Sequence, residues 1–502
     1  MRFSEFFQKL RGGGSSRRKK KLPSKDDYSN YDLFYQVTYM SATAQAEIPR
    51  AKLFSLAASL ACPIARFFKK IDLITRELAY DYSESCRTVG ESVDMPDVKS
   101  LLLRFSNSLA AGEPLDDFMG REAQMKAASY ENEYERDLES MRKWTDAYAA
   151  LIISVALVII INAISTLIYE ISAGTMLGMA VVAVGVGAMG SWIIWRSAPK
   201  EVGQLTMPGG SKEQLLAKTF TTTLLPLTVV ACLGLLVLRV PLGWIYILAA
   251  ILLLPLGAVG MLDARHVTGK NQEFAFFIRT LGGLATSAGT TLTEALTRVN
   301  LRSFPSLSED IKRLKLRLLA SIDPAVCWRR FRAEAGSELI NQSASMFYDS
   351  VLLGGEPENV GFFCSLYASQ ITGLQAKRGS VASTFIGLSV VMHAVVVSLM
   401  ILIVEIVSAF LLVLDAQITP GAMALPLPVF SIGGAQHIRV LNQMVSPVIF
   451  LLTVTTALAM KASQGGQRDQ VFFHLCILMF VTGVCCLAVP ILAGTLFGGL
   501  AI

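Results

Sequence analysis

Seven stretches of this 502-residue chain are long and apolar enough to cross a lipid bilayer as helices. A bilayer core of about 30 Å takes about 20 helical residues, and a helix pairs its own backbone groups where lipid cannot. The composition agrees, because 53% of the residues are hydrophobic, only 17% are charged and the mean hydropathy is +0.50. The sequence therefore predicts an all-α, polytopic helical membrane protein. The stretches are residues 148–169, 175–195, 220–238, 244–262, 383–414, 444–460 and 471–497.

The distribution of lysine and arginine predicts how these stretches are oriented. Loops rich in positive charge are retained on the cytoplasmic side of a membrane. If all seven stretches cross, every one of the 45 Lys and Arg residues lies on one side except Arg239 and Arg439. We therefore expect a cytoplasmic (inner) membrane protein with its N-terminus in the cytoplasm and its C-terminus outside. Residues 220–262 are predicted to form a hairpin of two spans. Four spans then separate the two soluble segments, and without the hairpin two spans separate them, an even number in both cases.

The soluble segments are expected to be helical. Apolar residues recur there at helical spacing, for example at Ile71, Ile74 and Leu78, and no alternating strand pattern competes. The expected parts are a basic tail (1–30), a first cytoplasmic helical domain (31–147), four spans (148–262), a second cytoplasmic helical domain (263–382) and three spans (383–502).

Two charged segments belong to the first part of the chain. The run from Arg17 to Lys21 follows a Gly/Ser stretch, and we expect it to be disordered and to contact the anionic surface of the lipid bilayer, with a solvated tail as the alternative. Residues 130–143 predict a charged helix that continues into the first span, the alternative being a surface helix of the domain. A continuous helix of this kind can carry motion from a cytoplasmic motor into the membrane.

The two soluble segments are related by an internal repeat. Shifting the sequence by 243 residues places Lys69-Lys70 on Lys312-Arg313 without a gap. The same shift places Gly112-Glu113-Pro114 on Gly355-Glu356-Pro357, and a further glycine, Gly354, precedes the second motif. A tripeptide shared at the same offset as a basic pair indicates duplication of one helical bundle.

The Gly-Glu-Pro motif predicts a corner between two antiparallel helices. Glycine ends a helix readily in the left-handed conformation, and proline is tolerated in the first turn of the next helix. A plain structural corner and a direct contact with a partner are both compatible with this motif.

The second copy resembles the type II secretion system F domain. The residues that carry the resemblance are the segment 274–279 (FAFFIR), the segment 289–296 (GTTLTEAL) and the glycine pair Gly354-Gly355, followed by apolar spans. Two copies with a basic extension and extra spans between them are most similar to the tandem-domain platform proteins of the archaellum and archaeal type IV pili. The first copy departs from the pattern, since Ala46 stands where the second copy has Gly289.

This resemblance implies a function. Its cytoplasmic bundles are expected to dock on a hexameric secretion ATPase, and its membrane helices to move pilin-like or archaellin-like subunits from the bilayer into a filament. A homodimer is the expected oligomer. Basic clusters in both copies are candidate ATPase-docking surfaces, with solvated helix faces as the alternative. They comprise Lys69, Lys70, Lys312, Arg313, Lys315, Arg317, Arg329 and Arg330.

Four polar residues inside the apolar stretches call for an explanation. A charge in lipid costs a few kcal/mol unless it is paired or reached by water. Glu405 is expected near the outer interface or in a helix contact, or alternatively at a site that meets a passing subunit. Asn162 and His393 are expected to form hydrogen bonds between helices, as is His474.

The sequence lacks the motifs of an enzyme. No GxxxxGK[ST] phosphate loop occurs, and the four histidines show no metal-binding or triad-like spacing. The eight cysteines form no CxxC pair and are expected to be reduced. We therefore expect no catalytic activity, no cofactor and no metal, and the modest net charge of +6 gives no reason to expect nucleic acid. A secondary transporter and a motor-free membrane scaffold remain as alternatives.

Overall fold

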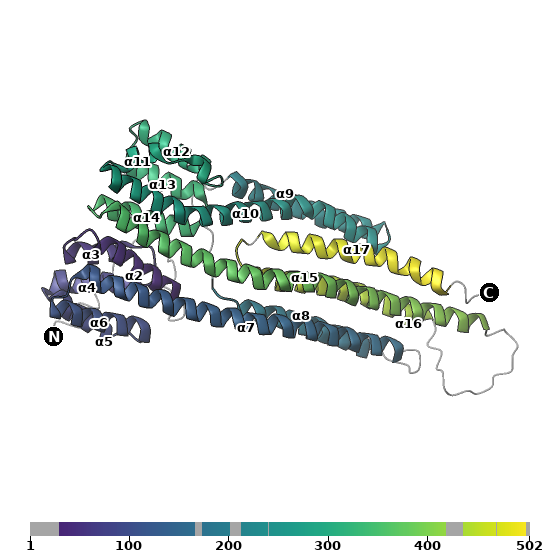
Figure 1. The fold of residues 1–502 in the computed structure, drawn as a ribbon. Helices are drawn as coiled ribbons and strands as arrows, with labels where there is room; N and C mark the ends of the chain where they lie inside the picture. Colours follow the sequence, from purple (N-terminus) through teal and green to yellow (C-terminus); the bar gives the residue numbers. More distant parts are fainter. Residues whose placement is uncertain are drawn as a thin grey trace, which may run out of the picture. The chain divides into compact units, whose positions relative to one another are not determined.

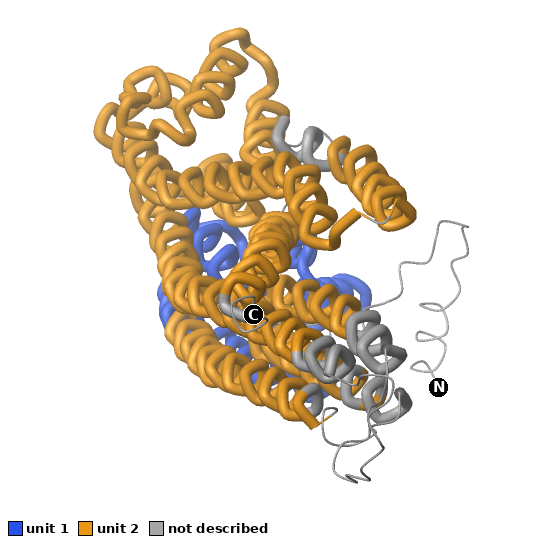
Figure 2. The backbone as a smooth tube through the Cα atoms, turned by 90° about the vertical axis from the view of Figure 1, so that its right-hand side faces the viewer, with its two compact units in different colours: residues 1–126 blue, residues 127–502 orange. Residues whose placement is uncertain are grey.

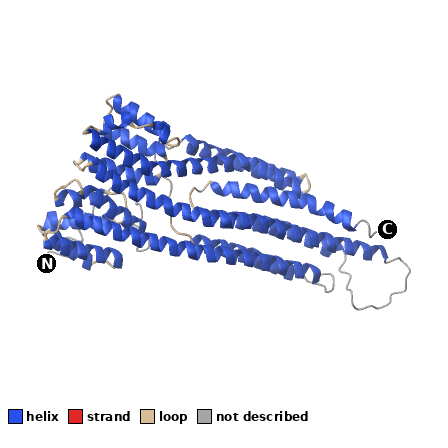
Figure 3. Ribbon diagram, in the orientation of Figure 1, coloured by secondary structure: helices blue, strands red, loops and turns tan. Residues whose placement is uncertain are grey.

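The computed structural model describes residues 30–165, 173–200, 212–238, 240–417, 435–467 and 469–497. Every regular element in these ranges is a helix (Figure 3). The predicted all-α fold is therefore confirmed. The chain separates into two compact units, residues 1–126 and 127–502 (Figure 2), which are considered one at a time below.

The first unit is a bundle of short helices around an aromatic core. The ring of Phe105 stacks between Phe54, at 5.1 Å between centroids, and Phe118, at 5.2 Å. Beside this core, Arg104 donates two hydrogen bonds of 2.7 Å to the buried carboxylate of Glu122. The helices are α2 (Asn30–Ala44), α3 (Arg50–Ser59), α4 (Ala65–Leu78), α5 (Tyr82–Glu91), α6 (Pro96–Ala111) and the start of α7 (Leu115–Ser165).

The second unit contains a similar bundle, in which short helices gather at one end of two long ones (Figure 1). Its core is also aromatic: Phe331 lies 5.8 Å from Trp328 and 6.3 Å from Phe277 between ring centroids. The elements are α10 (Leu242–Ala288), α11 (Leu292–Arg298), the 3₁₀ turn η1 (Leu301–Ser303), α12 (Ser308–Leu319), α13 (Pro324–Ala335), α14 (Glu338–Leu352) and α15 (Pro357–Gln417).

The helix bounds repeat at the offset found in the sequence. Adding 243 to the bounds of α4 gives 308–321, and α12 spans Ser308–Leu319. The same addition to α5 gives 325–334, where α13 spans Pro324–Ala335. For α6 it gives 339–354, where α14 spans Glu338–Leu352. The two bundles thus share the order and length of their helices, so the internal repeat is confirmed in the structure.

Six helices of the described residues are long and apolar enough to cross a membrane. The predicted hairpin 220–262 forms two separate helices that pack together, α9 and α10. The second predicted stretch, residues 175–195, lies in α8 (Ala173–Ser197), in which the apolar segment Val181–Ser197 is shorter than a full span. The six are α7, α9 (Lys212–Val237), α10, α15, α16 (Ala435–Gln464) and α17 (Gln470–Phe497).

Small residues allow close packing between α10 and α17. A Cβ atom added to Gly257 would lie 2.7 Å from the Cα of Phe473, and one added to Gly260 would lie 3.1 Å from the backbone of Asp469. The hydrophobic effect does not drive helices together in lipid, so they associate through close backbone packing and hydrogen bonds. These glycines therefore seat α17 against the membrane half of α10.

Candidate functional site

The long helices α7 and α15 meet at equivalent positions of the repeat. The Gln370 side chain donates a hydrogen bond of 3.1 Å to the carbonyl of Ala127, and these two residues are 243 positions apart. Seven residues further on, the ammonium of Lys377 lies 3.3 Å from a carboxylate oxygen of Glu131 and also pairs with Glu135. The contacts proceed toward the C-terminus along both helices, so α7 and α15 run parallel. Because equivalent residues of the repeat meet, the pair is in register.

Each of these helices joins a bundle directly to the apolar region. The charged segment 130–143 lies within α7, which runs without a break to Ser165, as the sequence predicted. Helix α15 extends over 61 residues, from the corner at Pro357 to Gln417. Neither helix is interrupted between its charged and its apolar part.

Arg378, beside Lys377, joins α15 to two further helices. Its guanidinium is buried and donates to the carbonyls of Ser463 and Pro199, both at 2.9 Å, and of Ala462 at 3.0 Å. Ala462 and Ser463 stand in the last turn of α16, and Pro199 follows the end of α8. Carbonyls at a helix C-terminus lack intrahelical partners and carry the negative end of the helix dipole. Nothing in the sequence distinguishes Arg378 from its neighbour, so this contact was missed.

The corner motif of the first copy ends α6 and begins α7. Gly112 adopts the left-handed conformation with φ +72°, and the backbone N–H of Glu113 donates to the carbonyl of Ser108 at 3.1 Å. The Glu113 carboxylate accepts from the Ser108 hydroxyl at 2.6 Å and pairs with Arg121. Pro114 stands directly before the first helical residue of α7.

The corner of the second copy is shifted by one residue. The left-handed residue is Gly354, with φ +100°, although the equivalent of Gly112 is Gly355. Glu356 accepts from the Asn359 side chain at 2.7 Å, and Pro357 is the first residue of α15. The corner packs tightly on α10, since a Cβ atom added to Gly282 would lie 2.2 Å from the carbonyl oxygen of Pro357.

The predicted basic clusters fall into two kinds of environment. Arg313 pairs with Asp310 at 2.7 Å, and Arg317 pairs with Glu334 at 2.6 Å. Hydrogen bonds to Glu334 raise the pKa of Arg317 above its usual value. Lys315 donates to a backbone carbonyl, that of Thr297, at 3.3 Å. The exposed members of the clusters are Lys69, Lys70, Lys312, Arg329 and Arg330.

Apolar side chains accompany the exposed lysine of α12. Leu316 and Leu319 follow Lys312 at spacings of four and seven residues and are 57% and 54% exposed. Residues at this spacing lie on one helix face. We call Lys312, Leu316 and Leu319 the α12 stripe. It combines positive charge with apolar surface, which is typical of a protein-binding face.

The intramembrane polar residues have different surroundings. The Nε2 atom of His393 lies 3.0 Å from the hydroxyl of Thr482 on α17 and 3.3 Å from that of Thr453 on α16. His474 lies 2.7 Å from the Gln464 side chain. The side chain of Asn162 and the basic run 17–21 lie outside the residues described.

Glu405 lines a cavity of about 190 Å³. The other walls are mostly apolar, with Tyr246, Ser446 and Cys486 as further polar or polarizable groups. Its equivalent under the 243-residue shift is Asn162, so both copies carry a polar residue at this position of the long helix.

No cluster of His, Cys, Asp or Glu suited to a metal ion occurs among the residues that the structure describes. All eight cysteines are free thiols. Burial raises the pKa of Cys62 to about 11 and also raises the pKa of Cys86, so both thiols are protonated at neutral pH.

The fold and these contacts define a polytopic helical membrane protein in which two copies of a bundle each continue into a long helix. The sequence is similar to the flagella accessory protein J of Methanocaldococcus jannaschii, with 20% identity over 435 residues, which cover 84% of this chain and 76% of that protein. It is also similar to the flagella accessory protein J of Methanococcus voltae, with 22% identity over 305 residues, 58% of this chain and 54% of that protein. No protein-family model and no solved structure matches the chain. The expected resemblance to an archaellum protein is therefore confirmed as distant homology.

Replacement of Arg378 tests the contact between α15, α8 and α16. Arg378→Ala leaves three carbonyls without their donor, and each unsatisfied buried group costs about 1–3 kcal/mol. We expect a clearly lower thermal unfolding midpoint for the purified protein in detergent, and Arg378→Lys to recover only part of it, since an ammonium cannot reproduce the planar fork. The adjacent, half-exposed Lys377→Ala is the matched control and should change the midpoint little. Equal effects of the two alanine variants would contradict this assignment.

Proposed function

We propose that this protein is the integral membrane platform of an archaellum-like, type IV pilus-like or type II secretion-like machine. In this role it couples a cytoplasmic hexameric secretion ATPase to the insertion of pilin-like or archaellin-like subunits into a filament. The in-register pair of α7 and α15 carries the proposal, because these two equivalent helices run side by side and each continues into the apolar region without a break. The relatives named flagella accessory proteins support it.

The membrane arrangement belongs to the same proposal. Residues 31–147 and 263–382 form the two cytoplasmic domains, residues 148–262 and 383–502 contribute the spans, and residues 1–30 are a basic tail. The N-terminus is cytoplasmic and the C-terminus is outside, as the lysine and arginine distribution favours. Two copies of the chain meet the hexameric motor as a homodimer.

Docking on the ATPase uses the exposed part of the basic clusters. Lys69 and Lys312 are equivalent under the repeat, and both are exposed, one on each bundle. The α12 stripe adds two exposed leucines to the second of these positions. Arg313 and Arg317 have a different role in this proposal, since their carboxylate partners hold α12 against α13.

Subunit handling is assigned to the Glu405 cavity. A carboxylate bordered by apolar walls favours a partner that is mainly apolar and carries a hydrogen-bond donor or a positive charge. The transmembrane helix of a filament subunit has this chemistry when it presents one such group. The cavity thus offers a contact that a subunit can form and leave during its transfer.

Deletion of the gene tests the function itself. A platform is required for filament assembly, so the deletion strain should lose one class of surface filament, and the wild-type gene supplied in trans should restore it. Electron microscopy of whole cells provides the measurement. Cells that keep all of their filaments, or that instead lose uptake of a solute, would overturn the proposal in favour of a scaffold or a transporter.

Charge reversal tests docking. The double variant Lys69→Glu, Lys312→Glu is expected to reduce co-purification with the ATPase at least about tenfold, because like charges placed at an interface cost several kcal/mol. Lys99→Glu is the matched control, since Lys99 is an exposed lysine of the first bundle outside the clusters. Unchanged co-purification of the double variant would remove the docking surface from the proposal while leaving the platform role untouched.

Substitution of Glu405 tests the cavity. Glu405→Gln keeps the shape but removes the charge, and Glu405→Leu also removes the polar group. We expect filament number per cell to fall in both variants, more strongly in the leucine variant, while membrane insertion of the protein stays at the wild-type level. Normal filaments in Glu405→Leu would show that the carboxylate takes no part in assembly.

A further inference from the structure

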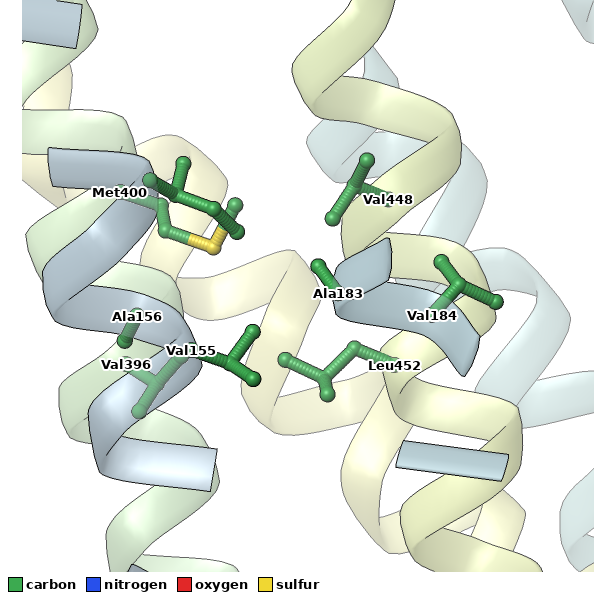
Figure 4. A pocket seen from close by; sticks show the side chains of 9 residues that line it. Val155, Ala156, Ala183, Val184, Val396, Met400, Val448 and Leu452 are labelled. Atoms are coloured by element: carbon green, nitrogen blue, oxygen red, sulfur yellow. The ribbon is translucent and has the colours of Figure 1, made fainter. Parts of the chain in front are cut away.

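Two cavities of equal size lie between neighbouring helices of the second unit. Each has a volume of about 10 Å³ and is lined by residues of α7, α15 and α16, and the first is also lined by two residues of α8. The first, shown in Figure 4, is enclosed only by apolar side chains. They are Val155, Ala156, Ile159, Ala183, Val184, Val396, Met400, Val448 and Leu452.

The second cavity differs in its polarity. Four of its seven lining residues carry a hydroxyl or an imidazole: Tyr148, Ser389, His393 and Thr456. All four are buried, with 2–6% of their surface exposed. Ser389 and His393 stand one helical turn apart on α15, while Tyr148 belongs to α7 and Thr456 to α16. Polar groups from three helices therefore converge on one small space.

His393 brings an unused hydrogen-bonding atom to this space. Its Nε2 atom is engaged by Thr482 and Thr453, neither of which lines the cavity. Its Nδ1 atom is buried and has no hydrogen-bond partner among the described residues. The hydroxyl of Ser389 lines the same cavity. A buried ring nitrogen without a partner is unfavourable unless something fills the gap.

We propose that the second cavity binds one ordered water molecule, held by His393 Nδ1 and by the hydroxyl groups around it. A cavity of this volume takes a single water, and a water is retained where two to four polar partners surround it. The first cavity has the same volume and no polar partner, so it stays empty. Polarity rather than size separates the two.

The water makes one network out of two. Tyr148 and Thr456 form a pair at 3.3 Å between α7 and α16, and His393 forms a cluster with Thr453 and Thr482 across α15, α16 and α17. The water joins the pair to the cluster, so that the long helices of both copies share one hydrogen-bonded system inside the membrane. A water bridge can be broken and remade without leaving a polar group unpaired, which permits small shifts of α7 against α15. This inference does not depend on the proposed function.

Solid-state NMR of the full chain in lipid bilayers tests the site. The protein carries only four histidines, so ¹⁵N-labelled histidine gives few signals, and His393→Gln assigns the one of interest. Magnetisation transferred from water protons at short mixing times should reach the His393 Nδ1 signal. His266, which is exposed, serves as the positive control for transfer from water.

Two variants separate the bound water from other sources of signal. Ser389→Val replaces the hydroxyl of Ser389 with two methyl groups, which remove a polar partner and fill the wet cavity, and should abolish the transfer to His393. Val396→Leu fills the apolar cavity and should leave that transfer unchanged. The proposal is overturned if wild-type His393 receives no transfer while His266 does, or if a folded Ser389→Val variant keeps the full signal. If Ser389→Val does not fold, the proposal is judged by the wild-type protein alone, from the presence or absence of transfer to His393 relative to His266.

Discussion

The in-register pairing of α7 and α15 is the contact on which the rest of the second unit depends. Gln370 meets Ala127, and Lys377 meets Glu131 and Glu135, so the two helices enter the apolar region side by side at a fixed stagger. Each of these contacts is modest in energy, because half-exposed ion pairs are screened by water. Their effect is to set the register. Once the register is set, Tyr148 on α7 faces Thr456 and Phe385, and the polar groups deeper in the bundle reach their partners.

Helix α15 carries most of the polar contacts that bind the membrane helices together. Arg378 holds the carbonyls at the ends of α8 and α16. About three to four turns further along α15, Ser389 and His393 face α7, α16 and α17. Polar groups are costly in lipid, so each one must be satisfied inside the bundle or by water. This requirement favours one arrangement of apolar helices over the many that would bury similar apolar surface.

The sequence predicted the large features because they rest on patterns with strong physical causes. Long apolar runs predict spans, and a gap-free offset of 243 residues indicates duplication, so the helices and the repeat followed directly. Finer features depend on tertiary contacts. The one-residue shift of the second corner arises because Gly354 and Gly355 are both able to adopt positive φ, and only packing on Gly282 of α10 selects between them. The ion pairs of Arg313 and Arg317 with Glu334 depend on how α12 packs on α13, so the sequence pattern alone did not predict them. The contacts of Arg378 likewise depend on where the ends of α8 and α16 lie.

The two copies have diverged in a way that explains why they pair with each other. The 243-residue shift gives the residues that would face each other if two α15 helices paired in the same register. Leu374 and Arg378 would then stand in the places of Glu131 and Glu135, opposite Lys377. Two cations would then face each other, and like charges at adjacent positions repel. An α7–α7 pair would bring Tyr134 against the same two carboxylates and lose the ion pair altogether. Only the mixed pair of α7 and α15 places opposite charges together, so divergence after duplication disfavours pairs of identical helices from two chains.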